Sequence, residues 1–181
     1  SLAFGTLIVL LVFFSIASPN FFTWSNISGV LLSTAVIGIL ALGTTFVIIT
    51  GGIDLSIGTG MALSAVMTGV FITNLGMPVI VGVLGGIATG VAMGLINGLN
   101  VTFLRLPPFI ATLAMMMIAG GLALVISGVR PIYFSGSAPD FKQIALGTLI
   151  PGLPNAVLIT LVLAVIAYLV LTKTLLGRYT F

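Results

Sequence analysis

The sequence predicts an all-α, polytopic integral membrane protein: a bundle of about six transmembrane helices. Three observations lead to this fold class: 60% of the 181 residues are hydrophobic, only 4% are charged, and the mean hydropathy is +1.42. A soluble domain carries about a quarter charged residues. Five basic and two acidic side chains cannot cover a folded surface of this size in water, so most of it must face lipid. The composition therefore excludes a soluble globular enzyme.

The predicted helices are apolar runs bounded by Pro, Gly, Asn or a charged residue. The first run, 2–17, and the last, 156–171, are short for a transmembrane helix of roughly 20 residues. The second run, 27–50, would be about 36 Å long at 1.5 Å per residue, enough to span a bilayer with tilt. The remaining runs are 55–73, 78–99 and 109–126. The alternating pattern of a membrane barrel is absent, so we expect a single transmembrane domain over residues 1–181.

Basic residues predict the orientation of these helices. Lys173 and Arg178 follow the last helix, and Arg105 lies between the fourth and the fifth. Both positions are cytoplasmic if the helices alternate in direction, because cytoplasmic loops carry an excess of Lys and Arg. The long connection 127–155 then lies on the outer side.

The residue types that are missing limit the chemistry. The chain has no Cys and no His, so it lacks disulfides, thiolate metal sites and the commonest metal ligand and general base. It also lacks a GxxxxGK[ST] phosphate-binding loop, and its few basic residues are too scattered to bind nucleic acid. We therefore expect no catalytic residue, metal or cofactor in this chain. Energy for active transport would come from an ATP-hydrolysing partner or an ion gradient, or the protein would be a passive pore.

Five glycines recur at every fourth position of the fourth predicted helix. They share one row on the helix surface, and the absence of side chains along that row lets a second helix approach closely. We expect this row to serve helix packing rather than to form a moving or dimeric interface. Its members are Gly82, Gly86, Gly90, Gly94 and Gly98.

Asp54 is the only charged residue before Arg105, and it lies in a glycine-containing segment between the second and third helices. An acid at membrane depth is unfavourable unless it is paired, capped or hydrated. One interpretation makes Asp54 the N-cap of the third helix, accepting bonds from the amides of its first turn. The other makes it a functional pivot at a broken helix, and the two are compatible. The pattern leaves open whether 51–58 is a turn at the inner surface or a re-entrant break.

Several neutral polar residues lie near helix ends or inside the predicted bundle. Their hydroxyl and amide groups could contact a polyhydroxylated solute along a pathway. They could equally bond neighbouring helices or, for Thr, the carbonyl four residues earlier. The candidates are Thr44, Thr45, Thr50, Asn97 and Asn100.

Five segments carry a resemblance that covers nearly the whole chain. They are SPNFFT (18–23), ITGGIDLSIG (49–58), GLING (94–98), PFIATL (108–113) and LGRY (176–179). In this order and spacing they resemble the permease subunits of bacterial ATP-binding-cassette importers for ribose, xylose, galactosides and related monosaccharides. From the matched motif around Asp54 we carry over only Gly52, Asp54 and Ser56, without assigned roles.

The resemblance implies a multi-pass protein of the bacterial inner membrane that moves a monosaccharide by alternating access. It implies a second permease copy or homologue, cytoplasmic subunits that bind ATP, and a periplasmic sugar-binding protein. It also implies that a coupling loop for the ATPase and further helices follow Phe181. The alternatives are an ion-gradient-driven secondary carrier with a broken helix at Asp54, and a membrane scaffold that transports nothing.

Overall fold

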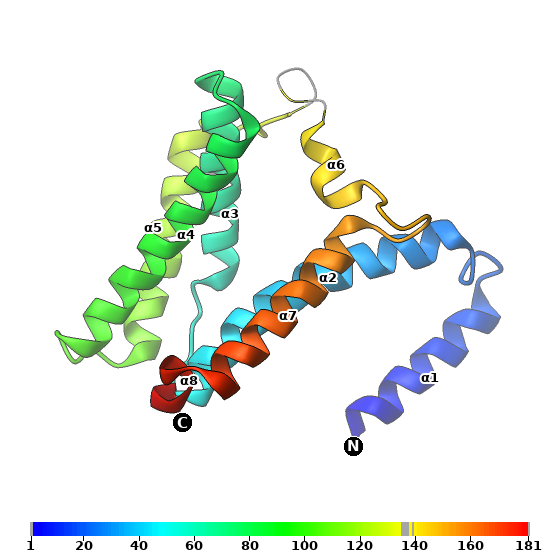
Figure 1. The fold of residues 1–181 in the computed structure, drawn as a ribbon, viewed down its shortest axis with the longest axis horizontal. Coiled ribbons are helices and arrows are strands. Elements are labelled where there is room, and N and C mark those ends of the chain that lie inside the picture. The colour runs from blue at the N-terminus through cyan, green and yellow to red at the C-terminus, as the bar shows by residue number, and fades with distance from the viewer. Residues whose placement is uncertain (1, 135–137, 139, 181) are drawn as a thin grey trace. The chain divides into compact units, whose positions relative to one another are not determined.

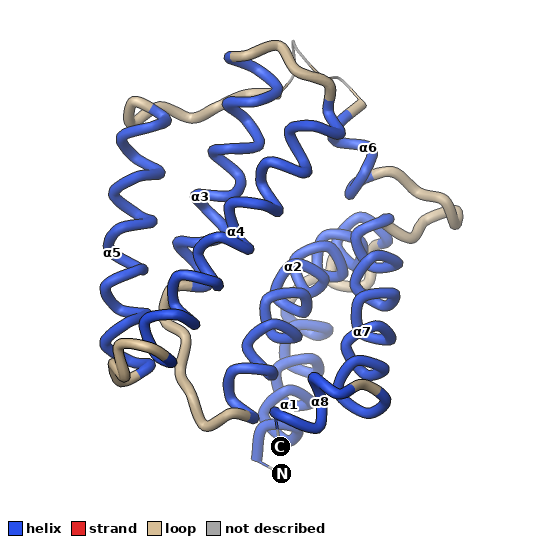
Figure 2. Tube along the Cα trace, turned by 60° about the vertical axis from the view of Figure 1, so that its left-hand side comes forward, coloured by secondary structure: helices blue, strands red, loops and turns tan. Residues whose placement is uncertain are grey.

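The computed structural model describes residues 2–134, 138 and 140–180. Within these residues all regular structure is helical, apart from one isolated β-bridge between Ile150 and Leu153, so the all-α prediction is confirmed (Figures 1 and 2). In chain order the elements are α1 (Leu2–Ala17), α2 (Trp24–Ile49), α3 (Ile57–Gly69), the π-helical turn η1 (Val70–Asn74), α4 (Val79–Thr102), α5 (Pro108–Ser127), α6 (Phe141–Leu146), α7 (Asn155–Lys173) and α8 (Leu175–Thr180).

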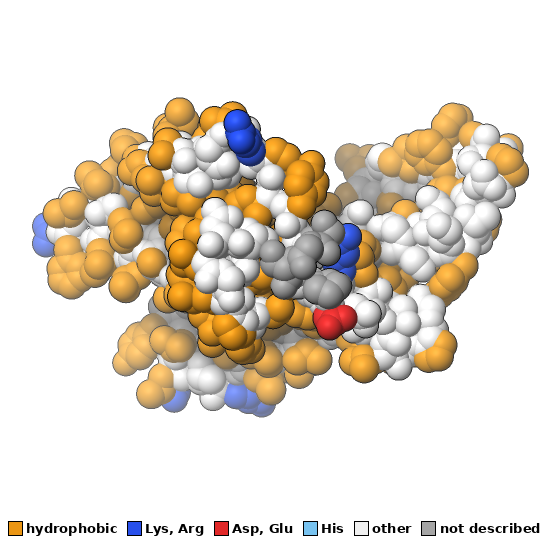
Figure 3. Space-filling view, turned by 90° about the horizontal axis from the view of Figure 1, so that it is seen from above, with side chains coloured by type: hydrophobic (Ala, Val, Ile, Leu, Met, Phe, Trp, Pro, Cys, Tyr) orange, Lys and Arg blue, Asp and Glu red, His pale blue; other side chains and the backbone are white. Residues whose placement is uncertain are grey.

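Five of the described helical segments are long and apolar enough to cross a membrane. They are α2, α3 continued through η1, α4, α5 and α7, with 18 to 26 residues each. The remaining predicted span, α1, has only 16 residues. Hydrophobic side chains also cover most of the face drawn in Figure 3, with few charged groups among them. The protein is therefore a polytopic membrane bundle, in which the exposed apolar surface faces lipid or other protein segments.

The helix boundaries follow the predicted ones within a few residues, with three differences. The predicted helix 55–73 begins later, at Ile57, and its last turn is the wider π-helical turn η1. This turn places both Phe71 and Ile72 against glycines of α4. An apolar run does not distinguish α from π turns, so the sequence carried no signal for it. The short helices α6 and α8 were also not predicted.

The chain folds as two compact units. The first comprises residues up to 39 together with 143–166. Here the hydroxyl of Thr160 on α7 shares its proton between the carbonyl oxygen of Ala156 in its own helix at 2.8 Å and that of Ala35 on α2 at 3.1 Å. Gly38 permits this approach, because a Cβ there would lie only 3.2 Å from the Thr160 methyl group.

The second unit comprises residues 40–142 together with 167 onward. Its core lies where α3 packs against both α4 and α5, and the three helices form one group in Figures 1 and 2. The buried side chains at this junction are Leu63, Met93, Met115, Ala119 and Ala123. This packing positions the segment that carries Asp54.

Candidate functional site

The segment between α2 and α3 begins with two glycines that have different roles. Gly51 has a φ of +75°, a conformation that side chains other than glycine adopt rarely. Gly52 is buried, and a Cβ there would lie 3.1 Å from Cγ1 of Val47 and 3.7 Å from Cβ of Pro108. The first glycine therefore turns the chain at the end of α2, and the second lets the backbone pass closely between α2 and α5.

Beyond these glycines the segment enters the helix bundle. The hydroxyl of Thr112 shares its one proton between two carbonyl oxygens, that of Pro108 in its own helix at 2.8 Å and that of Ile53 in the segment at 3.1 Å. Thr112 lies four residues into α5, which is about 6 Å along its axis. Ser56 contacts Asn97, five residues before the last residue of α4, which is about 7.5 Å along that axis. The segment is thus a short re-entry into the bundle and not a turn outside it.

Asp54, Ser56 and Asn97 form a chain of hydrogen bonds inside this re-entry. Oδ1 of Asp54 accepts from the backbone N–H of Ser56 at 2.7 Å and from its hydroxyl at 2.6 Å. The same hydroxyl oxygen accepts from Nδ2 of Asn97 at 3.0 Å. The chain joins two residues of the matched motif to a pathway candidate on α4 that lies 41 positions later in the sequence.

Asp54 lies just before the N-cap position of α3 and accepts one of the amide bonds expected of a cap. The N-cap residue of α3 is Ser56, and its side chain makes no capping bond to the first turn of the helix. Asp54 stands two residues before the N-cap and bonds Ser56 itself. A carboxylate in this position orders the entry to α3, because it holds the backbone and the side chain of the N-cap residue together.

One buried polar atom in this cluster lacks a partner. Oδ1 of Asn97 is buried and forms no hydrogen bond within the part of the protein that the structure describes. The side chain as a whole is 8% exposed. A buried acceptor left in this state costs about 1–3 kcal/mol. Such an atom needs an explanation in terms of a bound molecule or of another conformation.

Two hollows meet at this chain of residues. One, of about 300 Å³, lies toward the middle of α3 and α4, where Gly60, Ser64 and Gly90 line it. The other, of about 250 Å³, lies toward α5 and includes Gly98 and Thr112. Asp54, Gly94 and Asn97 line both hollows. Among the described residues that line them, Asp54 alone is charged, so the site is a largely apolar surface that carries a few neutral polar groups and one carboxylate.

The glycine row of α4 divides into two parts. A Cβ at Gly82 would meet Ile72, and one at Gly86 would meet the Thr68 hydroxyl, so these glycines pack tightly against α3 and η1. A Cβ at Gly90 would only touch the Ser64 hydroxyl at 3.4 Å. A Cβ at Gly94 or Gly98 would have no neighbour within 4 Å among the described residues, and both glycines line hollows.

The remaining pathway candidates lie elsewhere. The three threonines of α2 and its C-terminal end return their hydroxyls to carbonyl oxygens of that helix, at 2.7–2.9 Å. Of these, only Thr50 lines one of the two hollows described above. Asn100 is half-buried one turn beyond Asn97 and lines neither hollow. The geometry thus brings Asn97 and Thr50 to the site and leaves Thr44, Thr45 and Asn100 outside it.

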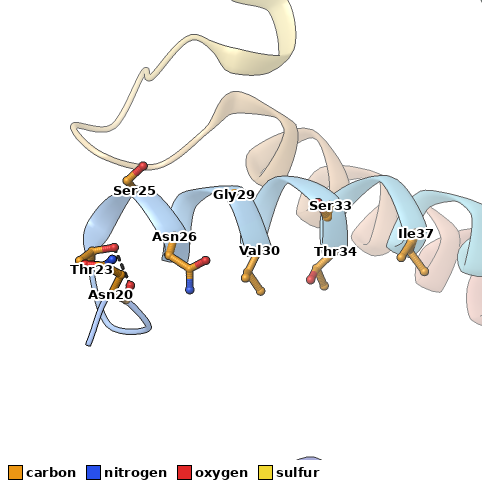
Figure 4. Close-up of a pocket in the computed structure, with 9 residues that line it drawn as sticks. All are labelled: Asn20, Thr23, Ser25, Asn26, Gly29, Val30, Ser33, Thr34 and Ile37. Carbon is orange, nitrogen blue, oxygen red and sulfur yellow. Dashed lines mark hydrogen bonds between the residues drawn. The ribbon is translucent and has the colours of Figure 1, made fainter. Parts of the chain in front are cut away.

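A polar face on the first half of α2 escaped the sequence analysis. It borders an open hollow of about 750 Å³ in the first unit. In Figure 4, Asn26, Val30, Thr34 and Ile37 project from one side of the helix, and Ser33 lies beside them. At 3.6 residues per turn this side is opposite Ala35, which packs toward α7. The spacing of the polar residues 26, 33 and 34 was the available signal, but the apolar run as a whole hid it.

Comparisons with known proteins agree with the resemblance. Residues 26–181 match the family described as the permease component of branched-chain amino acid transport systems. The chain is 42% identical over 176 residues to the ribose import permease protein RbsC of Bacillus subtilis (strain 168), which covers 97% of this chain and 54% of that protein. It is 36% identical over 177 residues to RbsC of Escherichia coli (strain K12), with 97% and 54% covered.

A further relative bears a different sugar in its name. The D-allose transport system permease protein AlsC of Escherichia coli (strain K12) is 34% identical over 171 residues, covering 94% of this chain and 52% of that protein. The chain thus spans about half the length of the curated relatives it matches. No solved structure matches the chain. Together with its membrane-length helices, these matches show that the chain belongs to the permease-component family of branched-chain amino acid transport systems and is a multi-pass inner-membrane protein.

Proposed function

We propose that this chain is the membrane-spanning part of the permease subunit of an ATP-driven importer, and that it moves a monosaccharide across the bacterial inner membrane by alternating access. The observation that carries the proposal is the similarity, over nearly the whole chain, to permeases named for ribose and D-allose. Those names describe the relatives, and the sugar handled by this protein is for experiment to identify.

The described surfaces support a polar, uncharged solute. Hydroxyl and amide groups line the hollow on α2 and the two hollows around Asn97, and Asp54 is the only charged residue among the described lining residues. Neutral hydrogen-bonding groups in a membrane are unfavourable against lipid. They suit a passage in which a sugar exchanges its water for weak bonds to protein and then leaves again.

The proposed complex contains parts that this chain does not supply. Two cytoplasmic subunits bind and hydrolyse ATP, which is the only cofactor the proposal requires. A second permease copy or homologue completes the passage, and a periplasmic protein delivers the sugar. ATP binding in the partners shifts the permease pair between inward-open and outward-open packings, because the partners contact the two packings differently.

The test uses the complete permease purified with its associated subunits and reconstituted in proteoliposomes. ATP hydrolysis and sugar uptake are measured with a panel of monosaccharides, each with and without the cognate binding protein. We expect one sugar to stimulate hydrolysis and to accumulate only when ATP is present. Uptake that follows a proton or sodium gradient without ATP would overturn the proposal, and so would the absence of any response across the panel.

A further inference from the structure

Asp54 and Asn97 stand at the junction of two hollows, and their hydrogen bonds leave an excess of acceptors. Oδ1 of Asp54 already accepts the N–H and the hydroxyl proton of Ser56. Because that hydroxyl has donated its only proton, its bond to Asn97 requires the amide nitrogen of Asn97 as donor. This fixes the orientation of the amide, so the carbonyl oxygen is the atom of Asn97 without a partner.

Two acceptors therefore remain on neighbouring side chains. Oδ1 of Asn97 is buried without a donor, and Oδ2 of Asp54 receives no hydrogen bond from the described residues. Among those residues, no Lys or Arg lines either hollow. The molecule that completes the site must supply donors, which a hydroxyl-rich solute does.

A metal cation fits this arrangement less well than a hydroxyl group. Divalent cations take six or more oxygen ligands, commonly with several carboxylates. Among the described residues no cluster of three or more His, Cys, Asp or Glu side chains could hold one, and both hollows contain Asp54 as their single carboxylate. Neutral hydroxyls need only one acceptor each, and adjacent hydroxyls of a sugar match a pair of neighbouring acceptors.

We propose that Asp54 and Asn97 form a hydroxyl-binding subsite for the transported solute, with Oδ2 of Asp54 and Oδ1 of Asn97 as acceptors. Ser56 is a positioning residue that holds both side chains. The Asn97 carbonyl is enclosed in this conformation, so the solute reaches it when α4 shifts beside Gly94. Gly94 borders open space, because a Cβ there would have no neighbour within 4 Å among the described residues, whereas Gly82 and Gly86 hold the other part of α4 against α3 and η1. This inference rests on the proposed function and adds the subsite to it.

The experiment compares variants of the full-length permease in the reconstituted complex, with uptake of the transported sugar and of its single-deoxy analogues. Asp54→Asn keeps an oxygen for the bonds from Ser56 and replaces only Oδ2 with an amide group. Asn97→Leu removes the carbonyl, and with it the amide donor to Ser56, with little change of shape. Asn100→Leu, on the same helix but outside both hollows, is the matched control. The same binding protein serves all variants, so its preferences cancel when the uptake ratio of a sugar to its deoxy analogue is compared between variants.

We expect wild-type protein and Asn100→Leu to discriminate against at least one deoxy analogue. Each site variant should lower that discrimination about 2- to 10-fold, the effect of one hydrogen bond, and should raise KM for the parent sugar. If Asn97→Leu does not fold, Asp54→Asn decides the question alone, because it retains the contact to Ser56.

The possible failures are distinguishable. Absence of ATP-driven sugar uptake by the wild-type complex overturns the proposed function and the subsite with it. Normal uptake with unchanged discrimination in Asp54→Asn overturns the subsite only. A wild-type KM that depends on sodium concentration, with this dependence lost in Asp54→Asn, would assign the site to a cation and also overturn the inference.

Discussion

Replacing Gly86 with alanine tests how tightly α4 packs against α3. The added methyl group would contact the Thr68 hydroxyl and would lie 2.9 Å from the Ser64 carbonyl oxygen. The Thr68 hydroxyl cannot move away freely, because it donates to that same carbonyl at 2.9 Å. Overpacking of this kind costs about 1–3 kcal/mol, and the better helix propensity of alanine offsets about 0.5–1 kcal/mol. We expect a net destabilisation of about 1 kcal/mol, within a range of about 0–2.5 kcal/mol.

The assay is the free energy of unfolding of the full-length protein in mild detergent, from denaturant or thermal titration. Gly94→Ala is the matched control on the same helix row, where the methyl group meets no neighbour within 4 Å. Only the propensity gain applies there, so this variant should be neutral or more stable by about 0.5–1 kcal/mol. Equal unfolding free energies for the two variants would refute the reasoning, because they would show that the two parts of the row are packed alike.

Three further outcomes follow from the structure. Thr112→Val should lower the unfolding free energy by about 0.5–1.5 kcal/mol, because it removes a hydroxyl that bonds the re-entrant segment as well as its own helix. Thr89→Val, whose hydroxyl bonds only its own helix, should have a smaller effect in the same titration. Arg105→Gly should raise the free energy of unfolding by about 1 kcal/mol, because Arg105 has a φ of +54°, a conformation that is strained for any residue except glycine. A lower free energy of unfolding would argue against backbone strain at this position. Ser33→Leu should reduce ATP-driven uptake at least several-fold, because the larger side chain narrows the hollow on α2. Val36→Leu, which lies outside that hollow, should leave uptake unchanged. Equal uptake in both variants would remove α2 from the proposed passage.

The helices and their approximate ends could be predicted because their signals are local. The first helix spans residues 2–17, as expected, and α5 begins at Pro108, one residue before the predicted start. Proline fits the first turn of a helix, where its missing N–H has no partner to lose. The π-helical turn η1 gave no such signal, because its apolar residues fit an α-helix equally well.

The sequence indicated residues of the candidate site but not that they lie together. Asp54 was a candidate because it is an isolated charge, and Asn97 was one of five polar candidates. Which of those five lies beside Asp54 depends on the rotation and the axial offset of α4 against α3. Neither quantity can be predicted from a short segment of the sequence. The polar face on α2 was missed for a related reason, since its few polar residues become a surface only when the helix is seen from one side.

The sequence by itself determined that the protein lies in a membrane, that it is helical, and which family it resembles, because composition, apolar run length and short motifs do not depend on how the helices pack. Only the tertiary structure decided that Ser56 joins Asp54 to Asn97, that the re-entrant segment reaches Thr112, and that Gly82 and Gly86 pack while Gly94 borders open space. These contacts link residues far apart in the chain. Their existence depends on side-chain fit between whole helices, and that fit is set by three-dimensional packing.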